Sequence, residues 1–458
     1  MDNQEILRKI DIQRQYLEKN PMLNYKNRIQ ALKKLYKNIR LLTPEINAAL
    51  KQDLNKGSVE TYMVEIGMVL SEINYMIKHC KQFSSSQRVH TPLAQFPSTS
   101  YRLPCPYGIV LIISPWNYPF MLAIEPLVDA ICAGNSVIVK PSEISPNVSN
   151  IIERLITMTF DEGHVTTVQG GVEECSFLLD QDLDYIFYTG STRVGEIVMK
   201  KAAEHFTPVT LEMGGKSPCI VDATANIPLT ARRIVFGKFL NCGQTCVAPD
   251  YIYCDEKVKD QLIKELERQI ILQYTVDPIN NDNYPRMVNQ KQYNAMSSFI
   301  NKDNLIFGGR CNEAMLKIEP TILSATFDDP VMKEEIFGPI LPIVTFKTLD
   351  EAVANVNKLT KPLALYIFSS KKENQDKIIN RIPFGGGCIN DTIVHIATSE
   401  MGFGGLKQSG IGAYHGKVGF ETFTHYKSIL DKKTWLDLPM RYQPFNKIKE
   451  FLIKMFLR

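Results

Sequence analysis

The sequence predicts an α/β protein with two parallel-sheet domains, a small β arm and a C-terminal tail. A chain of 458 residues is too long for one compact core, because single cores rarely grow beyond about 250 to 300 residues. Short β-rich apolar segments alternate with helical segments over much of the chain, which is typical of parallel sheets with right-handed crossovers. A segment rich in Ser, Pro and Gln at residues 84–106 lacks this pattern and predicts an extended arm.

The composition is that of an ordinary folded protein and excludes several classes of function. Hydrophobic residues make up 44% and charged residues 22%, which leaves enough apolar surface to form cores. The net charge of +3 offers little attraction to nucleic acid, so no nucleic-acid partner is expected. The N-terminal residues lack a secretory signal, and no apolar run approaches the ~20 residues that span a membrane. A cytoplasmic protein is therefore expected.

The elements follow in order along the chain. Apolar positions at helical spacing predict packed helices over residues 5–80. The first alternating region then places strands at 108–114, 136–140, 165–169 and 184–190, and a second alternating region runs from 207 to about 370. The pattern divides the chain into one domain at 1–83 and 107–206, another at 207–390 and an arm at 84–106.

Two of the ten cysteines, Cys242 and Cys246, stand four residues apart in the sequence NCGQTCVAP. A disulfide is disfavoured in a reducing compartment, and no metal site is expected because no matching CxxC or HxxxH pair follows. Inert packing is the usual role of such thiols. The alternative is that Cys246, which follows the open backbone of Gly-Gln-Thr, acts as a nucleophile.

A carboxylate is expected to approach that thiol. Glu212 ends a predicted strand and is followed by two glycines, and a predicted helix separates it from Cys246. The helix and its return can bring Cys246 back beside the strand end. Glu212 is then either a general base whose pKa is raised by partial burial, or only a solvated charge.

Two further strand ends have the composition of ligand-binding turns. Lys140 and Glu143 follow the strand at 136–140, where they can hold ribose hydroxyls or remain a solvated strand end. The other turn, at 190–195, joins a strand to a helix, and free N–H groups there attract a phosphate. An ordinary βα turn has the same form. The residues of interest in it are Gly190, Ser191, Thr192, Val194 and Gly195.

Two loops and one histidine complete the candidates. The segment SPWNYPF at 114–120 carries Asn117, whose amide can donate to a developing oxyanion. The segment at 334–342 carries Glu335 and Phe337, which can hold a ribose and pack on a flat ring. An aromatic-rich turn and a bare loop are the alternatives without function. His395 is interpreted as a packed histidine rather than an acid or base.

Seven segments in this order resemble the aldehyde dehydrogenase superfamily: SPWNYPF, VKPSE, YTGSTRVG, LEMGGKSP, CGQTCVAPDY, EEIFGP and GFGGLKQSGIG. Each is weak alone, but seven in order across residues 114–412 are hard to obtain by chance. The phrases GQTCVAPDY and SGIGAYHGKVGFETFTHYKS resemble the class 3 branch, which acts on fatty and aromatic aldehydes. In two respects the chain departs from the pattern: the usual Pro-Phe-Gly-Gly reads Gly402-Phe403-Gly404-Gly405, and LKQSG is closer to the wider family.

The resemblance implies two Rossmann-like parallel-sheet domains, one cofactor-binding and one catalytic, and a β oligomerisation arm that completes the partner's sheet in a homodimer. Only the resemblance implies that 391–430 belongs to the same arm as 84–106, with a tail at 431–458. It implies Cys246 as the nucleophile, Glu212 as the general base and Asn117 as an oxyanion donor together with the Cys246 backbone N–H. The implied cofactor is NAD, with NADP also accepted, and Tyr118 borders the substrate pocket. The implied cofactor-binding residues are Ser114, Pro115, Trp116, Lys140, Glu143, Gly190, Ser191, Thr192, Val194, Gly195, Glu335 and Phe337.

By this resemblance the protein oxidises an apolar aliphatic or aromatic aldehyde to a carboxylic acid. Cys246 forms a thiohemiacetal and then a thioester, and water activated by Glu212 hydrolyses the thioester. Glu212 argues against reductive relatives that act on acyl phosphates or thioesters. A non-catalytic binding or structural protein with the same fold would need none of Cys246, Glu212 and Asn117.

The tail predicts a basic amphipathic helix over 445–458. Its apolar positions recur at helical spacing and its basic residues lie mostly elsewhere. Such a helix either packs on the dimer or makes peripheral contact with a membrane surface. The two sets are Ile448, Phe451, Leu452 and Met455, and Lys447, Lys449, Lys454 and Arg458.

Overall fold

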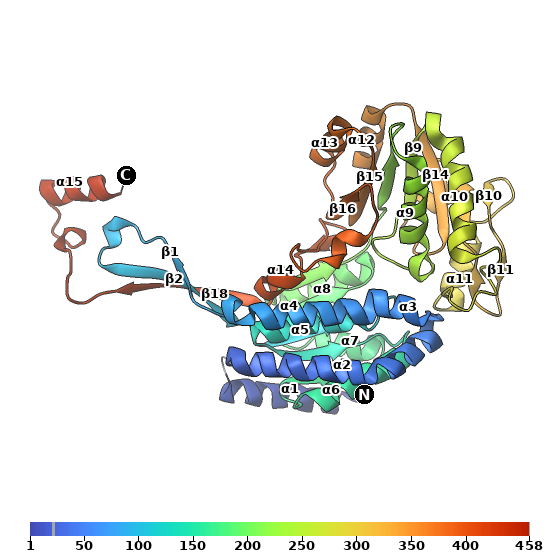
Figure 1. Ribbon diagram of the computed structural model, residues 1–458. Coiled ribbons are helices and arrows are strands. Elements are labelled where there is room, and N and C mark those ends of the chain that lie inside the picture. The colour runs from blue at the N-terminus through green and yellow to red at the C-terminus, as the bar shows by residue number, and fades with distance from the viewer. Residues whose placement is uncertain (21–22, 458) are drawn as a thin grey trace.

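The computed structural model describes residues 1–20 and 23–457. It contains two parallel-sheet domains packed against each other and an arm that extends away from both (Figure 1). This arrangement confirms the predicted α/β class. Arg458, the last residue of the predicted tail helix, lies outside the described residues.

The first sheet has six strands in the order β17-β7-β6-β3-β4-β5. Five of them run parallel, and β17 lies antiparallel at the edge beside β7. The five residues of β3 are all apolar and buried, as expected of a strand that is covered on both faces. The strands are β3 (Ile109–Ile113), β4 (Ser136–Lys140), β5 (Val165–Thr167), β6 (Tyr185–Thr189), β7 (Val209–Glu212) and β17 (Gly410–Ile411).

Helices cover both faces of this sheet. Val110 and Val137 point to a core shared with α2, α4, α5 and α6, whereas Leu111 and Ile138 point to a core shared with α1, α7 and α8. Alternate side chains of each strand therefore serve opposite cores. The helices are α1 (Asn3–Lys19), α2 (Tyr25–Leu54), α3 (Ser58–Thr61), α4 (Gly67–Phe83), α5 (Met121–Ala133), α6 (Pro146–Thr159), α7 (Val172–Leu179) and α8 (Thr192–Glu204), with a π-helical turn at Tyr62–Ile66.

β7 belongs to the first sheet, although the sequence pattern grouped it with the second alternating region. It pairs in parallel with β6, and Thr189 lies opposite Glu212. The next strand, β8, belongs to the other sheet. The two sheets therefore divide after Glu212 rather than at residue 207, because backbone pairing and not alternation decides the sheet of a strand. Glu212 consequently stands at the junction of the two domains.

The second sheet has seven strands in the order β10-β13-β14-β9-β8-β15-β16, and β10 alone is antiparallel to its neighbour. α9 and α10 cover one face, and α11, α12 and α13 cover the other. The strands are β8 (Pro218–Val221), β9 (Tyr251–Asp255), β10 (Leu305–Phe307), β13 (Thr321–Ser324), β14 (Ile340–Phe346), β15 (Ala364–Phe368) and β16 (Gly386–Ile389). The helices are α9 (Ile227–Phe239), α10 (Lys259–Tyr274), α11 (Gln290–Ser297), α12 (Leu349–Lys358) and α13 (Lys372–Arg381), and β11 (Cys311–Asn312) and β12 (Lys317–Ile318) form a small hairpin.

The arm is a three-stranded antiparallel sheet in the order β1-β2-β18. Its strands are β1 (Gln87–Val89), β2 (Ser98–Pro106) and β18 (Thr424–Lys432), and it projects well beyond the body of the molecule (Figure 1). The predicted arm segment 391–430 is divided between arm and body. β17 joins the first sheet, and α14 (Gly416–Thr422) packs on α4 and α5.

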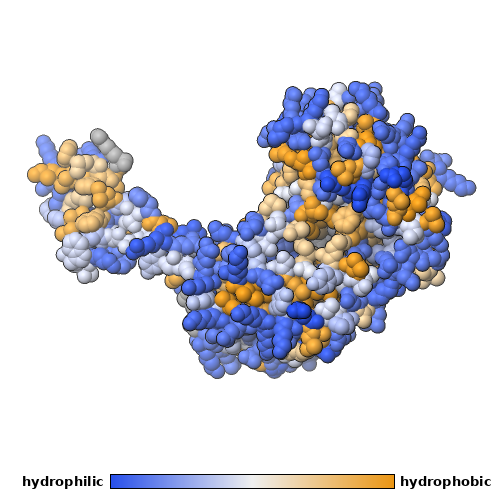
Figure 2. All heavy atoms as spheres, viewed as in Figure 1, coloured by the Kyte–Doolittle hydropathy of each residue, from blue (hydrophilic) through white to orange (hydrophobic). Residues whose placement is uncertain are grey.

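The tail ends in the helix α15 (Lys447–Phe456), which lies at the far end of the arm (Figure 1). Its apolar residues are exposed: Ile448 is 71% and Phe451 66% accessible. Figure 2 shows this helix as an apolar cluster separated from the body. Within the described residues, no helix is both long and apolar enough to cross a membrane.

Candidate active site

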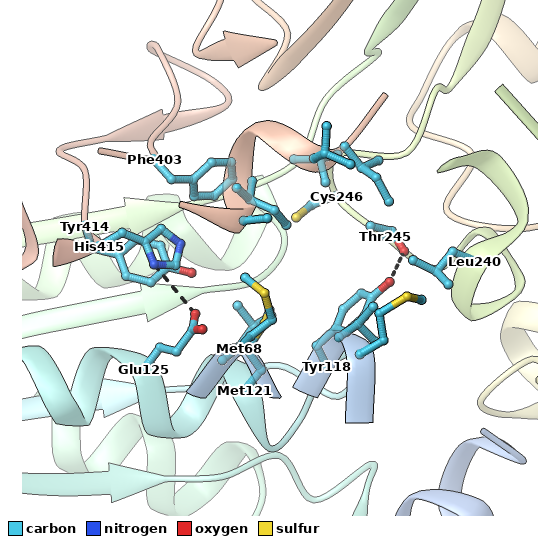
Figure 3. A pocket seen from close by; sticks show the side chains of 18 of the residues that line it. Met68, Tyr118, Met121, Glu125, Leu240, Thr245, Cys246, Phe403, Tyr414 and His415 are labelled. Atoms are coloured by element: carbon cyan, nitrogen blue, oxygen red, sulfur yellow. Dashed lines mark hydrogen bonds and ion pairs between the residues drawn. The ribbon is translucent and has the colours of Figure 1, made fainter. Parts of the chain in front are cut away.

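An apolar pocket lies where α4 and α5 face the segment that follows α9 (Figure 3). It encloses about 880 Å³ of empty space, its open mouth included. Met68, Met121 and Phe403 form parts of its wall, and the Cys246 side chain reaches it. A pocket of this composition suits an apolar ligand with one reactive group.

The segment that carries Cys246 has an unusual backbone. Asn241 and Cys242 have φ of 52° and 55°, and Gly243 follows with φ of 73°. A Cβ at Gly243 would lie 2.2 Å from the carbonyl oxygen of Gly338, so only glycine fits there. Asn and Gly are the residues that adopt the left-handed region most readily, which explains why this sequence turns sharply between α9 and β9.

The buried side chain of Gln244 then holds the segment in place. Its Oε1 accepts a hydrogen bond from the Val288 backbone N–H (3.0 Å), and its Nε2 donates to the carbonyls of Asn241 and Arg286 (both 3.1 Å). An amide with this many satisfied bonds is rigid. Cys246 therefore sits on a preformed loop.

The two thiols of the NCGQTC sequence have different surroundings. Cys246 is half-buried at the pocket, whereas Cys242 is fully buried and its Sγ lies 3.4 Å from the Tyr284 hydroxyl. Neither forms a disulfide. Burial raises the pKa of both thiols to about 12. For Cys246 the carboxylates of Glu335 and Glu212 raise the pKa further, and the backbone N–H groups of Cys246 and Val247 oppose that change.

Glu212 lies at the end of β7 with 2% of its surface exposed. Neither carboxyl oxygen has a hydrogen-bond partner among the described residues, and burial raises its pKa well above the usual value. A negative charge on Glu212 also raises the pKa of the Cys246 thiol. Glu212 is thus a buried group rather than a solvated charge at the strand end.

Asn117 and Tyr118 follow β3 and enter the same region. Asn117 is buried, and its amide donates to the carbonyl of Gln244 (3.0 Å). The Tyr118 hydroxyl is 2.6 Å from Thr245 Oγ1, and the Tyr118 ring lies under the ammonium group of Lys56 at 4.3 Å. Tyr118 lines the pocket, as Figure 3 shows. The loop after β3 and the cysteine segment are therefore directly connected.

Glu335 and Phe337 lie on the other side of the thiol. The Glu335 carboxyl group is so close to Gly214 that a Cβ there would meet its Oε2 at 2.0 Å, and burial raises the pKa of Glu335 to about 8. Phe337 adopts φ of 54° and its ring packs edge-on against Trp116, with centroids 5.4 Å apart. This loop therefore lies over both the end of the first sheet and the cysteine.

The remaining candidates line the carboxyl ends of β3, β4 and β6. The Ser114 N–H donates to the carbonyl of Lys140 (3.1 Å), which joins the ends of β3 and β4, and Pro115 follows half-buried. Lys140 forms an ion pair with the half-exposed Glu143 at 2.8 Å. At the end of β6, the hydroxyl of Thr189 is buried and has no hydrogen-bond partner among the described residues. This edge is where open α/β sheets bind ligands.

The turn after β6 begins α8. Ser191 is the N-cap residue, and its Oγ accepts from the Val194 N–H at 3.4 Å. The Thr192 hydroxyl donates to the Gln408 carbonyl. Gly190 and Gly195 are required for packing, because a Cβ at these positions would lie 2.3 Å from the Tyr188 hydroxyl and 2.5 Å from Met213 Sδ.

Several residues of this region carry no local sequence signal. Glu125 and His415 face each other across the pocket wall with Oε2 and Nδ1 3.7 Å apart. Lys56 and Glu65 form a buried ion pair of 2.6 Å, and Glu65 also accepts the N–H groups at the start of α5. The one sequence signal that could have indicated these two pairs is the presence of charged residues within otherwise apolar helices. His395 packs between aromatic rings, and burial lowers its pKa to about 4.

The comparisons with known proteins agree with this geometry. The model of the aldehyde dehydrogenase family matches residues 2–429. The chain belongs to the aldehyde dehydrogenase family. Aldehyde dehydrogenases are NAD(P)-dependent oxidoreductases that convert an aldehyde into the acid, and this protein has that activity.

Two curated relatives and one solved structure are closely similar over nearly the whole chain. A 4,4'-diaponeurosporen-aldehyde dehydrogenase of Staphylococcus aureus is 48% identical over 94% of both chains, and aldehyde dehydrogenase family 3 member A2 of Rattus norvegicus is 42% identical over 94% of this chain and 90% of its own. The structure of the substrate-bound state of Staphylococcus aureus AldH is 46% identical, covers 100% of both chains and has a TM-score of 0.97. The resemblance to the class 3 branch is confirmed by these relatives.

Two further aldehyde dehydrogenases bear on the cofactor. One of Rattus norvegicus, named as dimeric and NADP-preferring, is 42% identical over 88% of this chain and 90% of its own. The structure of an NAD-dependent enzyme of Sinorhizobium meliloti is 28% identical over 95% of this chain and 89% of its own, with a TM-score of 0.86. Both cofactors therefore occur among its relatives.

Proposed function

We propose that this aldehyde dehydrogenase oxidises an apolar aliphatic or aromatic aldehyde, with Cys246 as nucleophile, Glu212 as general base and Asn117 as oxyanion donor. The observation that carries the proposal is the Cys246 thiol at an apolar pocket, together with a buried Glu212 carboxyl that has no hydrogen-bond partner among the described residues and whose charge raises the pKa of that thiol. The name of the Staphylococcus aureus relative, which specifies a diaponeurosporen aldehyde, supports an apolar substrate. A reductive acyl enzyme and a non-catalytic protein are both disfavoured, because Glu212 and Cys246 are intact.

The reaction begins when Cys246 loses its proton and its sulfur attacks the aldehyde carbon. The side-chain amide of Asn117 and the backbone N–H of Cys246 stabilise the oxyanion of the thiohemiacetal. A bound nicotinamide cofactor would supply the hydride acceptor for this carbon. Once the hydride has left, the acyl group stays bound to Cys246 as a thioester. Glu212 then takes a proton from water, the resulting hydroxide attacks the thioester carbonyl, and Cys246 leaves as the acid is released.

The cofactor fits the edge formed by β3, β4, β6 and β7. In the part of the chain that the structure describes, the buried Thr189 hydroxyl and the Glu212 carboxyl have no hydrogen-bond partner at this edge, which supports a polar ligand here. Lys140 and Glu143 would hold the adenosine ribose, and the N-terminus of α8 would lie beside the pyrophosphate. Glu335 would hold the nicotinamide ribose, with Phe337 and Trp116 near the ring. The contributing turn residues would be Ser114, Pro115, Gly190, Ser191, Thr192, Val194 and Gly195.

Glu143 gives a reason for a preference between the two cofactors. Its carboxylate is paired with Lys140 and remains 46% exposed, so it is available to a ribose hydroxyl. A 2′-phosphate would meet this negative charge. We therefore expect NAD to be preferred, with NADP also accepted.

The arm and the tail support two proposals on assembly and location. The arm presents unpaired strand edges beyond the body, and such edges pair readily with another chain. We therefore propose a homodimer joined through the arms, and light scattering at micromolar concentration tests it.

The second proposal is that the enzyme is cytoplasmic and that its tail at 445–458 contacts membranes, because α15 exposes apolar residues next to lysines. Equal co-sedimentation of full-length and tail-deleted protein with anionic liposomes would contradict it; in that case packing on the dimer accounts for the tail.

The deciding experiment measures NADH formation by the full-length protein with aliphatic and aromatic aldehydes. We expect turnover with the wild type and its loss in Cys246→Ser. Turnover of the same size in that variant would refute the nucleophile. A variant at an exposed position, Glu196→Gln, serves as the control, since Glu196 lies on the surface of α8 and pairs there with Lys200.

A further inference from the structure

Besides Cys246 and Tyr414, the polar side chains that line the pocket form two pairs on opposite sides. Figure 3 shows Tyr118 with Thr245 on one side, Glu125 with His415 on the other, and the Cys246 sulfur between them. The two residues of the first pair are hydrogen-bonded to each other, because their hydroxyl oxygens are 2.6 Å apart. The second pair is open: Glu125 Oε2 and His415 Nδ1 are 3.7 Å apart, too far for a hydrogen bond.

Glu125 is a buried group that lacks a partner. Its residue is 1% exposed, and its Oε2 makes no hydrogen bond among the described residues. A buried acceptor without a partner costs about 1 to 3 kcal/mol. Such a group is retained where a ligand or a water completes its hydrogen bonds.

His415 is held in position by its backbone. It adopts φ of 82°, a strained value for this residue, and its ring stacks on Tyr414 with centroids 4.1 Å apart. Its N–H donates to Asp129 Oδ2, and the next N–H, of Gly416, donates to Glu72 Oε1 at 2.7 Å. The turn is thus anchored to α4 and α5, which holds the backbone that carries the imidazole in place.

The groups around this pair favour its uncharged form. Besides His415, Glu125 is surrounded by the acids Glu65, Glu72 and Asp129, and Lys56 is committed to Glu65. Burial and the neighbouring acids raise the pKa of Glu125 well above its usual value, and burial lowers the pKa of His415 to about 4. Burial thus disfavours the charged form of both side chains, and each can donate or accept hydrogen bonds.

We propose that Glu125 and His415 form a polar subsite that binds an uncharged hydrogen-bonding group, such as a hydroxyl, on the chain of the aldehyde substrate. A hydroxyl seated beside the pair, within hydrogen-bond distance of both side chains, donates to one partner and accepts from the other. A plain alkyl chain leaves both groups unpaired. The enzyme therefore selects hydroxyaldehydes over alkanals at one particular chain length. This inference rests on the proposed oxidation of an apolar aldehyde at Cys246 and adds the class of substituent.

The experiment compares kcat/KM of the full-length protein for ω-hydroxyaldehydes and for unsubstituted aldehydes of matched chain length. In the wild type we expect one length at which the hydroxyl raises kcat/KM by about tenfold, the size of one neutral hydrogen bond. Glu125→Leu, which keeps the volume, abolishes this preference, and Glu125→Gln restores most of it. Met68→Leu, an apolar change in the same wall, alters both substrates by the same factor.

A binding measurement keeps the test independent of turnover. The increase in unfolding temperature caused by an α,ω-diol is compared with that caused by the matching alkanol, for wild type and Glu125→Leu. We expect the diol to stabilise the wild type more, and the variant to lose the difference. If diol and alkanol raise the unfolding temperature of the wild type equally at every chain length, the subsite is overturned. A stronger preference for an amino-aldehyde would also overturn it, because that preference would require a charged Glu125. Loss of oxidation of every aldehyde would instead contradict the proposed function, while the diol measurement would still decide the subsite.

Discussion

The side-chain amide of Asn117 donates a hydrogen bond to the backbone carbonyl of Gln244, two residues before Cys246. The amide of Asn241 donates to the same carbonyl at 3.1 Å and to the carbonyl of Asn117 at 2.8 Å. The loop after β3 and the cysteine segment are thereby joined in one network. Since an amide nitrogen carries two donors, Asn117 keeps a second N–H for a developing oxyanion.

Replacing Asn117 by alanine is expected to lower kcat by about 10² to 10³, the usual effect of removing one oxyanion donor. Stability should change little, because the Gln244 carbonyl keeps its bond from Asn241. Steady-state NADH formation and denaturant unfolding measure the two quantities. Asn241→Gly is the matched variant: glycine adopts the same left-handed backbone, and we expect a larger loss of stability with a smaller loss of kcat. If the Asn117 variant lost mainly stability and the Asn241 variant lost mainly kcat, Asn117 would not be the oxyanion donor.

The two cysteines of NCGQTC should respond differently to the same substitution. Cys246→Ala is expected to abolish NADH formation and leave the fold intact, because the thiol borders a pocket. Cys242→Ala removes a fully buried sulfur beside Tyr284 and is expected to cost about 1 kcal/mol, as a small core truncation does, with kcat close to wild type. Turnover in folded Cys246→Ala protein would contradict the proposed roles.

Glu212→Gln is expected to lower kcat by about 10² to 10⁴, the range of general base catalysis. Because hydrolysis of the thioester is slow without a general base, the acyl-enzyme formed on Cys246 should accumulate. Intact-protein mass spectrometry after mixing with NAD and aldehyde detects it. The exposed Glu196→Gln serves as control and should show neither effect. A slow variant with no acyl-enzyme would place Glu212 before thioester formation rather than after it.

The sequence predicts local elements well and tertiary pairs poorly, for a physical reason. The apolar run at 108–114 predicts β3, observed at Ile109–Ile113, because a buried parallel strand needs only local composition. The sheet of β7 depends on its neighbour β6, which lies twenty residues earlier and leaves no trace in the pattern of β7 itself. The Glu125–His415 pair joins residues of α5 and the loop before α14, and only folding brings them together. Cys246 and Glu212 each lie in a recognisable motif, and the strand end followed by a helix and its return already predicts that they approach each other.

Glu335→Gln is expected to lower the pKa of the Cys246 thiol. Besides burial, the Glu335 carboxylate is the largest cause that raises this pKa to about 12, because a nearby negative charge disfavours the thiolate. The pKa of Glu335 is itself about 8, so the charge is present above that pH and absent well below it. The rate at which iodoacetamide alkylates Cys246, followed by peptide mass spectrometry, should therefore be higher in the variant above pH 8 and should converge with wild type at lower pH. Glu334→Gln, an exposed neighbour, is the matched control and should leave the profile unchanged. A variant profile equal to wild type at alkaline pH would show that Glu335 does not act on the thiol.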